Sequence, residues 1–187
     1  LDSAKTSPYK FYQFWINCAD EDVLRFLKIF TFLSTADIAE LADAQQSQPG
    51  ARLAHRRLAQ EVTALVHGES AVAAVERITA AIFSNRIDAL TEQDFAQLAQ
   101  DGLPSTHFDL SEVGLLATLF ESGLATTPKG EVTLGQAKKL ILGNSVAVNG
   151  VKQIDPEFKL QASAARYGRY HLIQKGKKQH HLVVLKS

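Results

Sequence analysis

Residues 133–152 have the sequence TLGQAKKLILGNSVAVNGVK, which combines a helix signal with a hairpin signal. Thr133 followed three residues later by Gln136 is the pattern of a capping box, and apolar residues then recur at helical spacing. The stretch ends in valines that alternate around Asn149-Gly150, a dipeptide typical of tight β-hairpins. The sequence therefore predicts a capped helix followed directly by a two-stranded hairpin.

Further β-rich runs follow towards the end of the chain. Residues 169–174 and 180–185 flank the turn sequence KGKK at 175–178, which predicts a second hairpin. Ahead of the capped helix, Ser111 is expected to begin another helix that ends near Gly123. Together these elements predict a small domain of two helices and a sheet.

The amino-terminal part has helical periodicity only. Ser7-Pro8 predicts one helix start, and Ser34 followed by Asp37 predicts another. Between them, the acidic run 20–22 is expected to open a helix, because carboxylates complement the positive helix end. The polar run 45–50 predicts a loop.

We therefore expect an α+β chain of two domains. Residues 1–103 are predicted to form an all-helical domain, and residues 104–187 the small α+β domain. The stretch 102–108, which contains Pro104, is the expected linker between them.

The composition is ordinary for a globular protein, with 45% hydrophobic residues in 187. A single cysteine, Cys18, excludes an internal disulfide framework and suits a reducing compartment, so we expect a cytoplasmic protein. No apolar run approaches the roughly 18 residues of a membrane span, and the first residues lack the features of a secretory signal. Because methionine is absent, we expect the chain to be a piece of a longer protein.

A net charge of zero conceals an uneven distribution along the chain. Residues 1–125 contain nine Lys+Arg against 17 Asp+Glu, whereas residues 126–187 contain 11 against three. A basic carboxyl-terminal third favours binding of a polyanion such as RNA. The plain alternative is a solvated, lysine-rich surface.

The predicted helix, turn, capped basic helix and Val-x-Val-Asn-Gly hairpin resemble the RNA-binding module named after the fourth small-subunit ribosomal protein. In that family the capped helix and the hairpin cradle structured RNA. Leu134 stands where the family commonly has arginine, which calls that phosphate contact into question. The resemblance and the charge imply a set of RNA-binding residues: Gln136, Lys138, Lys139, Asn149, Lys152, Arg166, Arg169, Lys175, Lys177 and Lys178.

The chain as a whole is similar to the carboxyl-terminal, tRNA-binding portion of bacterial tyrosyl-tRNA synthetases. The matching segments, in order, are KTSPYKFYQFWIN (5–17), VLRFLK (23–28), FTFL (30–33), LVHGE (65–69), QLAQDG (97–102) and GRY (168–170). The resemblance implies a helical anticodon-binding domain followed by the ribosomal-type module. The family's catalytic Rossmann domain, with its His-x-Gly-His motif and Lys-Phe-Gly-Lys loop, is not in this sequence.

That resemblance implies that this chain contains no catalytic residue and binds no cofactor. The chain by itself is therefore not expected to form tyrosyl-adenylate. The parent enzyme would be a tyrosine–tRNA ligase that uses ATP. The implied partners are tRNA(Tyr), through its anticodon arm and long variable arm, and the missing catalytic domain. The family implies a homodimeric parent, whereas we expect the fragment to be a monomer. No membrane is implied.

Family members recognise the wobble guanosine with an acidic residue of the helical domain, and Asp20 or Asp22 is the candidate here. A carboxylate can accept hydrogen bonds from the ring N–H and the amino group of guanine. The alternative is that both residues only cap a helix.

Metal binding and nucleophilic catalysis are not expected. His180 and His181 point to opposite faces of a strand, so together with His171 they make a poor set of metal ligands. Cys18 lies on an apolar helix face without a nearby histidine.

Two other hypotheses stay open beside the tRNA-binding one. The chain could be a free-standing regulator that binds structured RNA, or an accessory module in RNA modification. It could also be a helical protein-interaction module with an incidental basic tail.

Overall fold

The computed structural model describes residues 2–84, 86–109 and 111–186. The chain divides into two compact units, Leu1–Ile78 and Thr79–Ser187, which are described separately here. The boundary expected between residues 103 and 104 falls inside the second unit. The described residues contain no helix that is long and apolar enough to cross a membrane.

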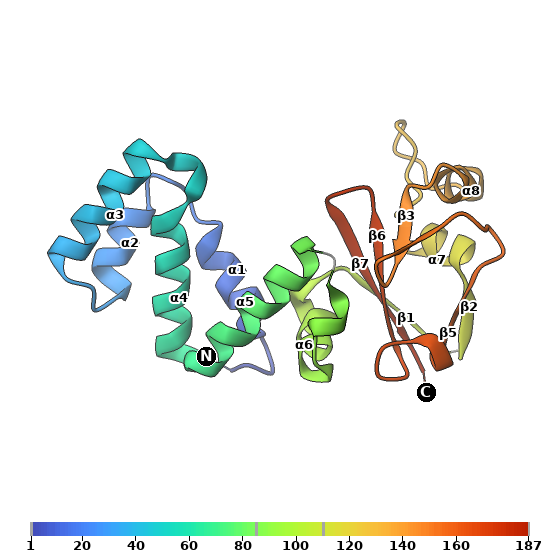
Figure 1. Ribbon diagram of the computed structural model, residues 1–187, viewed down its shortest axis with the longest axis horizontal. Helices are drawn as coiled ribbons and strands as arrows, with labels where there is room; N and C mark the ends of the chain where they lie inside the picture. The colour runs from blue at the N-terminus through green and yellow to red at the C-terminus, as the bar shows by residue number, and fades with distance from the viewer. Residues whose placement is uncertain (1, 85, 110, 187) are drawn as a thin grey trace. The chain divides into compact units, whose positions relative to one another are not determined.

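The first unit consists of helices, coloured blue to green in Figure 1. They are α1 (Pro8–Ile16), α2 (Val23–Phe30), α3 (Thr35–Ser47), the short 3₁₀ turn η1 (Pro49–Ala51), α4 (Leu53–His67) and the first part of α5 (Glu69–Ser84). Helix α4 packs against α1, α2 and α3, and its fully buried Leu58 lies at the centre of their shared core. Burying a side chain of this size stabilises the unit by about 1.5–3 kcal/mol.

Two of the predicted helix starts are confirmed at atomic detail. The Ser7 hydroxyl accepts a hydrogen bond from the backbone N–H of Lys10 at 3.0 Å, and Pro8 is the first residue of α1. Ser34 and Asp37 form a complete capping box at the start of α3. Such caps satisfy backbone donors that have no partner within the helix.

Two other expectations in this unit are wrong. The acidic run does not lie in a first helical turn: α2 begins at Val23, and Asp22 is its N-cap without a side-chain capping bond. Residues 45–47 are not loop but continue α3 to Ser47, because the helical ladder ends only where Pro49 follows.

The second unit is an α+β fold. After α5 come the 3₁₀ turn η2 (Ile87–Ala89), α6 (Glu92–Gln97) and a π-helical turn η3 (Leu98–Gly102). The remaining elements are β1 (Ser105–Phe108), β2 (Glu112–Gly114), α7 (Leu115–Glu121), α8 (Leu134–Leu142), β3 (Val146–Val148), β4 (Val151–Gln153), β5 (Lys159–Gln161), the 3₁₀ turn η4 (Ala162–Ala164), β6 (Tyr170–Lys175) and β7 (Gln179–Leu185).

The main sheet has the strand order β1-β7-β6-β3-β4. Strand β1 runs parallel to β7, and the other neighbours are antiparallel. Strands β2 and β5 form a separate antiparallel pair. Helices α7 and α8 contribute Leu119 and Ile141 to one core with Ile173 and Val183 of the sheet.

Both predicted hairpins are confirmed. Asn149 and Gly150 connect β3 to β4 with φ angles of 47° and 86°, the left-handed conformation that a two-residue turn of this kind requires. Thr133 caps α8 by accepting the backbone N–H of Gln136 at 3.1 Å. The stretch that predicted this part of the fold therefore forms a capped helix and then a hairpin.

The expected linker is instead partly a strand. Residues 105–108 form β1, and the Thr106 hydroxyl lies 2.8 Å from Nε2 of His181 on β7. The helix expected from Ser111 is also displaced: β2 forms first, and α7 begins at Leu115. Parallel pairing joins residues far apart in the sequence, so no short-range pattern predicts it.

Helix α6 packs within the second unit. Phe95 is fully buried, and its ring stacks on Tyr170 of β6 with the centroids 5.1 Å apart. The Tyr167 hydroxyl donates to the carbonyl of Leu90 at 2.9 Å. Residues 90–98 therefore pack against the start of β6 and the turn before it.

Candidate RNA interface

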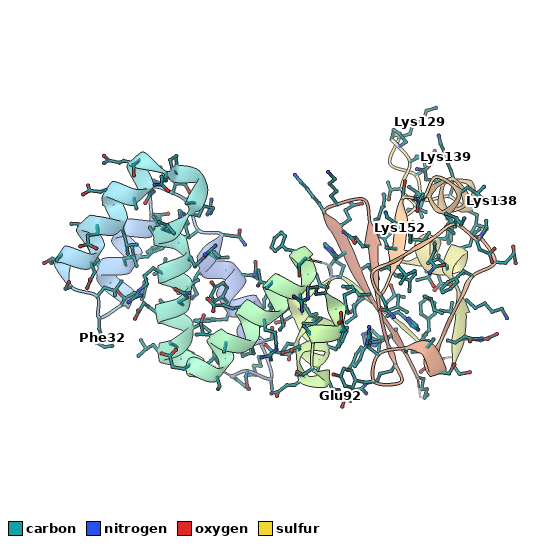
Figure 2. The ribbon with its side chains drawn as sticks, viewed as in Figure 1. Phe32, Glu92, Lys129, Lys138, Lys139 and Lys152 are labelled. Carbon is teal, nitrogen blue, oxygen red and sulfur yellow. The ribbon has the colours of Figure 1, made fainter. Side chains whose placement is uncertain are left out.

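Helix α8 has one buried face and one basic face. Ala137 and Ile141 are fully buried, whereas Lys138 and Lys139 are exposed. The cap at Thr133 fixes where the helix begins, so it also sets the direction of both lysines. Figure 2 labels these two residues on α8, together with Lys129 in the preceding turn and Lys152 in the β3–β4 hairpin.

Lys152 of β4 is tied to the end of α8. Its ammonium group donates to the carbonyl of Asn144 at 3.1 Å, while the side chain stays exposed. Asn144 has a φ of 52°, a left-handed conformation that ends the helix. The hairpin and the helix therefore present their positive charges from neighbouring positions.

The β6–β7 turn adds more basic residues beside the same helix end. The backbone N–H of Gly176 donates to the carbonyl of Ser145 at 2.9 Å, and Lys177 and Lys178 follow in exposed positions. Lys175 is half-buried, with its ammonium group 2.6 Å from the carbonyl of Leu124, just before the turn that carries Lys129. We refer to the exposed lysines Lys129, Lys138, Lys139, Lys152, Lys177 and Lys178 as the lysine-rich end.

Lys129 is exposed at this end of the unit but is not among the RNA-binding residues expected from the sequence. It lies in the turn between Thr126 and Val132, which are joined by an isolated β-bridge directly before α8. Gly130 has a φ of 87° in this turn. The Thr-Pro-Lys-Gly sequence before a capped helix was the available signal.

Arg166 and Arg169 lie at the opposite end of β6 from Lys175. They precede Tyr170, and the five residue steps from Tyr170 to Lys175 span about 17 Å. The Arg169 guanidinium stacks over the Tyr170 ring at 4.8 Å and lies 3.7 Å from the carboxylate of Glu92. Figure 2 shows Glu92 far from Lys129 and Lys139 within this unit. The structure thus separates the two arginines from the lysine-rich end.

Asn149 uses its side chain inside the protein. Its amide oxygen accepts the backbone N–H of Leu172 at 2.9 Å, and its amide nitrogen lies 3.1 Å from Nδ1 of His171. Nε2 of His171 lies 3.0 Å from the carbonyl of Gln161. Burial lowers the pKa of His171, which favours the neutral ring that this pattern needs. Gln136 is half-buried in the first turn of α8.

In the helical unit, Asp20 and Asp22 have different surroundings. The Asp20 side chain is 68% exposed, with Oδ1 at 3.4 Å from a guanidinium nitrogen of Arg52 and 3.1 Å from Nε2 of His55. Asp22 is 36% exposed and forms an ion pair with Arg25 one helical turn later, at 2.9 Å. Asp20 therefore offers the more accessible carboxylate.

The histidines of the sheet are engaged in packing. His181 contacts Thr106, and burial lowers the pKa of both His180 and His181. The part of the chain that the structure describes contains no group of three or more His, Cys, Asp or Glu that could hold a metal ion. Burial also raises the pKa of the Cys18 thiol, which disfavours the reactive thiolate.

Two family models match consecutive parts of the chain. Residues 1–84 match the model of class I tRNA synthetases for tryptophan and tyrosine, and residues 94–183 match the "Tyrosine–tRNA ligase SYY-like C-terminal domain". The first model ends with α5 at residue 84, and the second begins at residue 94, inside α6.

Curated relatives match over the whole chain. A tyrosine–tRNA ligase of Pectobacterium carotovorum is 45% identical over 191 residues, and one of Cronobacter sakazakii is 46% identical over 186 residues. Each match covers 100% of this chain and 42% of the relative, so the chain spans less than half the length of these proteins. The solved structure of a C-terminally truncated mitochondrial tyrosyl-tRNA synthetase from Aspergillus nidulans is 35% identical over 44% of this chain and 24% of that chain, with a TM-score of 0.42.

Proposed function

The chain belongs to the tyrosine–tRNA ligase family, as the carboxyl-terminal portion of such an enzyme, and on this premise we propose that it binds tRNA(Tyr). The remaining portion of the enzyme would attach tyrosine to this tRNA at the expense of ATP. We further propose that the parent enzyme is a cytoplasmic homodimer and that this chain alone is a monomer without ligase activity.

The observation that carries the proposal is the lysine-rich end of the second unit. Six exposed lysines from α8, the turn before it, the β3–β4 hairpin and the β6–β7 turn gather there. Neutralising RNA phosphates releases counterions, and this supplies most of the affinity without depending on sequence. The capped helix beside a hairpin also supports the assignment of this unit to the module of the fourth small-subunit ribosomal protein.

We assign the two arms of the tRNA to the two units. The lysine-rich end would bind the long variable arm, because double-stranded RNA is recognised mainly through its backbone and shape. The helical unit would bind the anticodon arm. Arg166 and Arg169, at the other end of β6, would contact RNA only if the bound molecule extends about 17 Å along the sheet.

We propose Asp20 as the residue that recognises the wobble guanosine. Asp20 has the two features that recognition of a guanine edge needs. Its carboxylate is exposed, and one oxygen, Oδ2, has no partner among the described residues. Asp22 supports this assignment less well, because its carboxylate is paired with Arg25 and is less exposed. A correct base-edge contact contributes about 1–3 kcal/mol of discrimination.

A binding titration tests the proposal. The chain should bind tRNA(Tyr) with an affinity that falls steeply between about 50 and 200 mM salt. Replacing Lys138 and Lys139 together with glutamine should weaken binding and reduce the slope of log affinity against log salt by about two, one for each phosphate contact. The measurement is filter binding at several salt concentrations.

A matched control removes the same charge elsewhere. Lys159 and Lys186 are exposed lysines of the same unit that pair with Glu112 and Asp109. Their double replacement with glutamine should leave the salt slope nearly unchanged. Equal losses in both double variants would contradict the assignment to α8, and equal affinity for unrelated structured RNAs would favour a general RNA-binding regulator.

A further inference from the structure

The loop between α1 and α2, residues 17–22, is held by side chains from outside it. Gln45 of α3 donates to the backbone carbonyl of Asp20 at 2.8 Å. Arg52 lies at the start of α4, and an N–H of one of its guanidinium nitrogens donates to the carbonyl of Ile16 at 3.0 Å. The other guanidinium nitrogen lies 3.4 Å from Oδ1 of Asp20. The backbone is therefore held at Asp20 and at the end of α1.

His55 lies beneath the same carboxylate. Its side chain is 2% exposed, on the buried face of α4, and Nε2 lies 3.1 Å from Oδ1 of Asp20 without the alignment of a full hydrogen bond. Burial is the main cause that lowers the pKa of His55, so the ring is neutral near pH 7. A buried polar ring needs a hydrogen-bond partner, and the Asp20 carboxylate lies within reach of Nε2.

The backbone at Arg52 supports the same conclusion. Arg52 has a φ of 49°, a left-handed conformation that is unfavourable for a residue other than glycine. This conformation begins α4 and turns the guanidinium back towards the α1–α2 loop, where it contacts both Ile16 and Asp20. Strain of this kind persists where surrounding contacts enforce it.

We propose that Arg52 and His55 are positioning residues that fix the Asp20 carboxylate in the orientation needed to bind the guanine edge. Both approach Oδ1, so the rotation of the carboxylate is set, while Oδ2 has no partner among the described residues and the side chain as a whole is 68% exposed. A guanine presents two adjacent donors, and a carboxylate fixed in advance loses less conformational freedom when it accepts both. The inference rests on the proposed recognition of the wobble base by Asp20.

The test measures discrimination rather than affinity alone. The probes are three anticodon stem–loop RNAs that differ only in the first anticodon base: guanosine, inosine, which lacks the amino group, and adenosine. The full 187-residue chain is titrated with each RNA, as wild type and as Asp20→Asn, His55→Leu, His55→Gln and Arg52→Asn. Glutamine keeps an N–H donor at position 55, and asparagine tolerates the left-handed backbone at position 52.

We expect wild type to bind the guanosine RNA about 5- to 150-fold more tightly than the adenosine RNA, with inosine between them. Asp20→Asn should remove this preference. His55→Leu and Arg52→Asn should each reduce it by about fivefold or more, with the affinity for the adenosine RNA unchanged, and His55→Gln should restore most of it. The mid-point of urea unfolding checks that each variant is folded. If His55→Leu does not fold, the result for Arg52→Asn tests whether Asp20 depends on a positioning residue.

Three results would overturn the inference, and they are distinguishable. If Asp20→Asn loses the preference while His55→Leu and Arg52→Asn keep it, Asp20 is the recognition residue but is not positioned by these partners. An equal loss for all three RNAs on Arg52→Asn would assign Arg52 to phosphate binding instead. If wild type binds the three RNAs equally, the proposed recognition itself is wrong and the inference with it.

Discussion

Three hydrogen bonds around His171 determine how its ring is protonated. The carbonyl of Gln161 can only accept, so Nε2 must carry the proton and Nδ1 must accept from the amide nitrogen of Asn149. The amide oxygen of Asn149 is then directed at the backbone N–H of Leu172. Asn149 therefore holds the β3–β4 turn against β6, and the same turn positions Lys152 of the hairpin.

Replacing Asn149 tests this role. Asn149→Ala should lower the free energy of unfolding by about 1–3 kcal/mol, because it leaves buried groups of His171 and Leu172 without partners. Urea unfolding at pH 7 measures the effect. Lys152→Ala, an exposed change in the same hairpin, should alter stability by less than about 0.5 kcal/mol. Equal effects of the two substitutions would contradict the assignment.

At the scale of elements, no local pattern in the sequence shows that α6 and β1 belong to the second unit. Phe95 stacks on Tyr170, and β1 adds a parallel strand next to β7. A truncated form that begins at residue 104 lacks α6 and exposes the Tyr170 ring to water. The loss of a buried phenylalanine alone costs about 3–5 kcal/mol.

Two fragments compare the alternative boundaries. The fragment 79–187 should unfold cooperatively in urea, whereas the fragment 104–187 should be destabilised by at least about 3 kcal/mol and lose a steep transition. Circular dichroism during urea titration measures both. Identical transitions of the two fragments would show that the boundary expected at 103/104 is the stable one.

The elements that could be predicted are those whose signals are local. Caps such as Ser7, Ser34 and Thr133, and the Asn149-Gly150 turn, involve residues three or four apart. The strand at 105–108 could not be predicted, because its partner β7 lies more than 70 residues later. The candidate site follows the same rule: the adjacent lysines 138 and 139 behind a capping signal are visible in the sequence, but their separation from Arg166 and Arg169 by the length of β6 depends on the sheet.

At the scale of the whole molecule, buried histidines make stability depend on pH. Burial lowers the pKa of His55, His67, His171, His180 and His181 below the ordinary value near 6.5. In the unfolded chain these rings take up protons as the pH falls through that value, whereas in the folded chain they stay neutral to lower pH. Protonation therefore favours the unfolded state.

We expect the free energy of unfolding to fall as the pH is lowered from 7.5 to 5.5, by at most about 1.4 kcal/mol per pH unit for each ring involved. Urea mid-points measured across this range give the slope. His55→Gln removes one of the rings and should make the slope shallower. A mid-point that stays constant over the range would show that the rings are protonated equally in both states.

The two outermost strands of the main sheet, β1 and β4, are only four and three residues long. Edge strands that are long, flat and apolar can pair with strands of neighbouring molecules and so initiate aggregation. Here β1 follows Pro104 and β4 contains Lys152, and proline and lysine both oppose pairing between edge strands. Because these edge strands are short and carry or follow such residues, we expect concentrated preparations of this chain to stay dispersed.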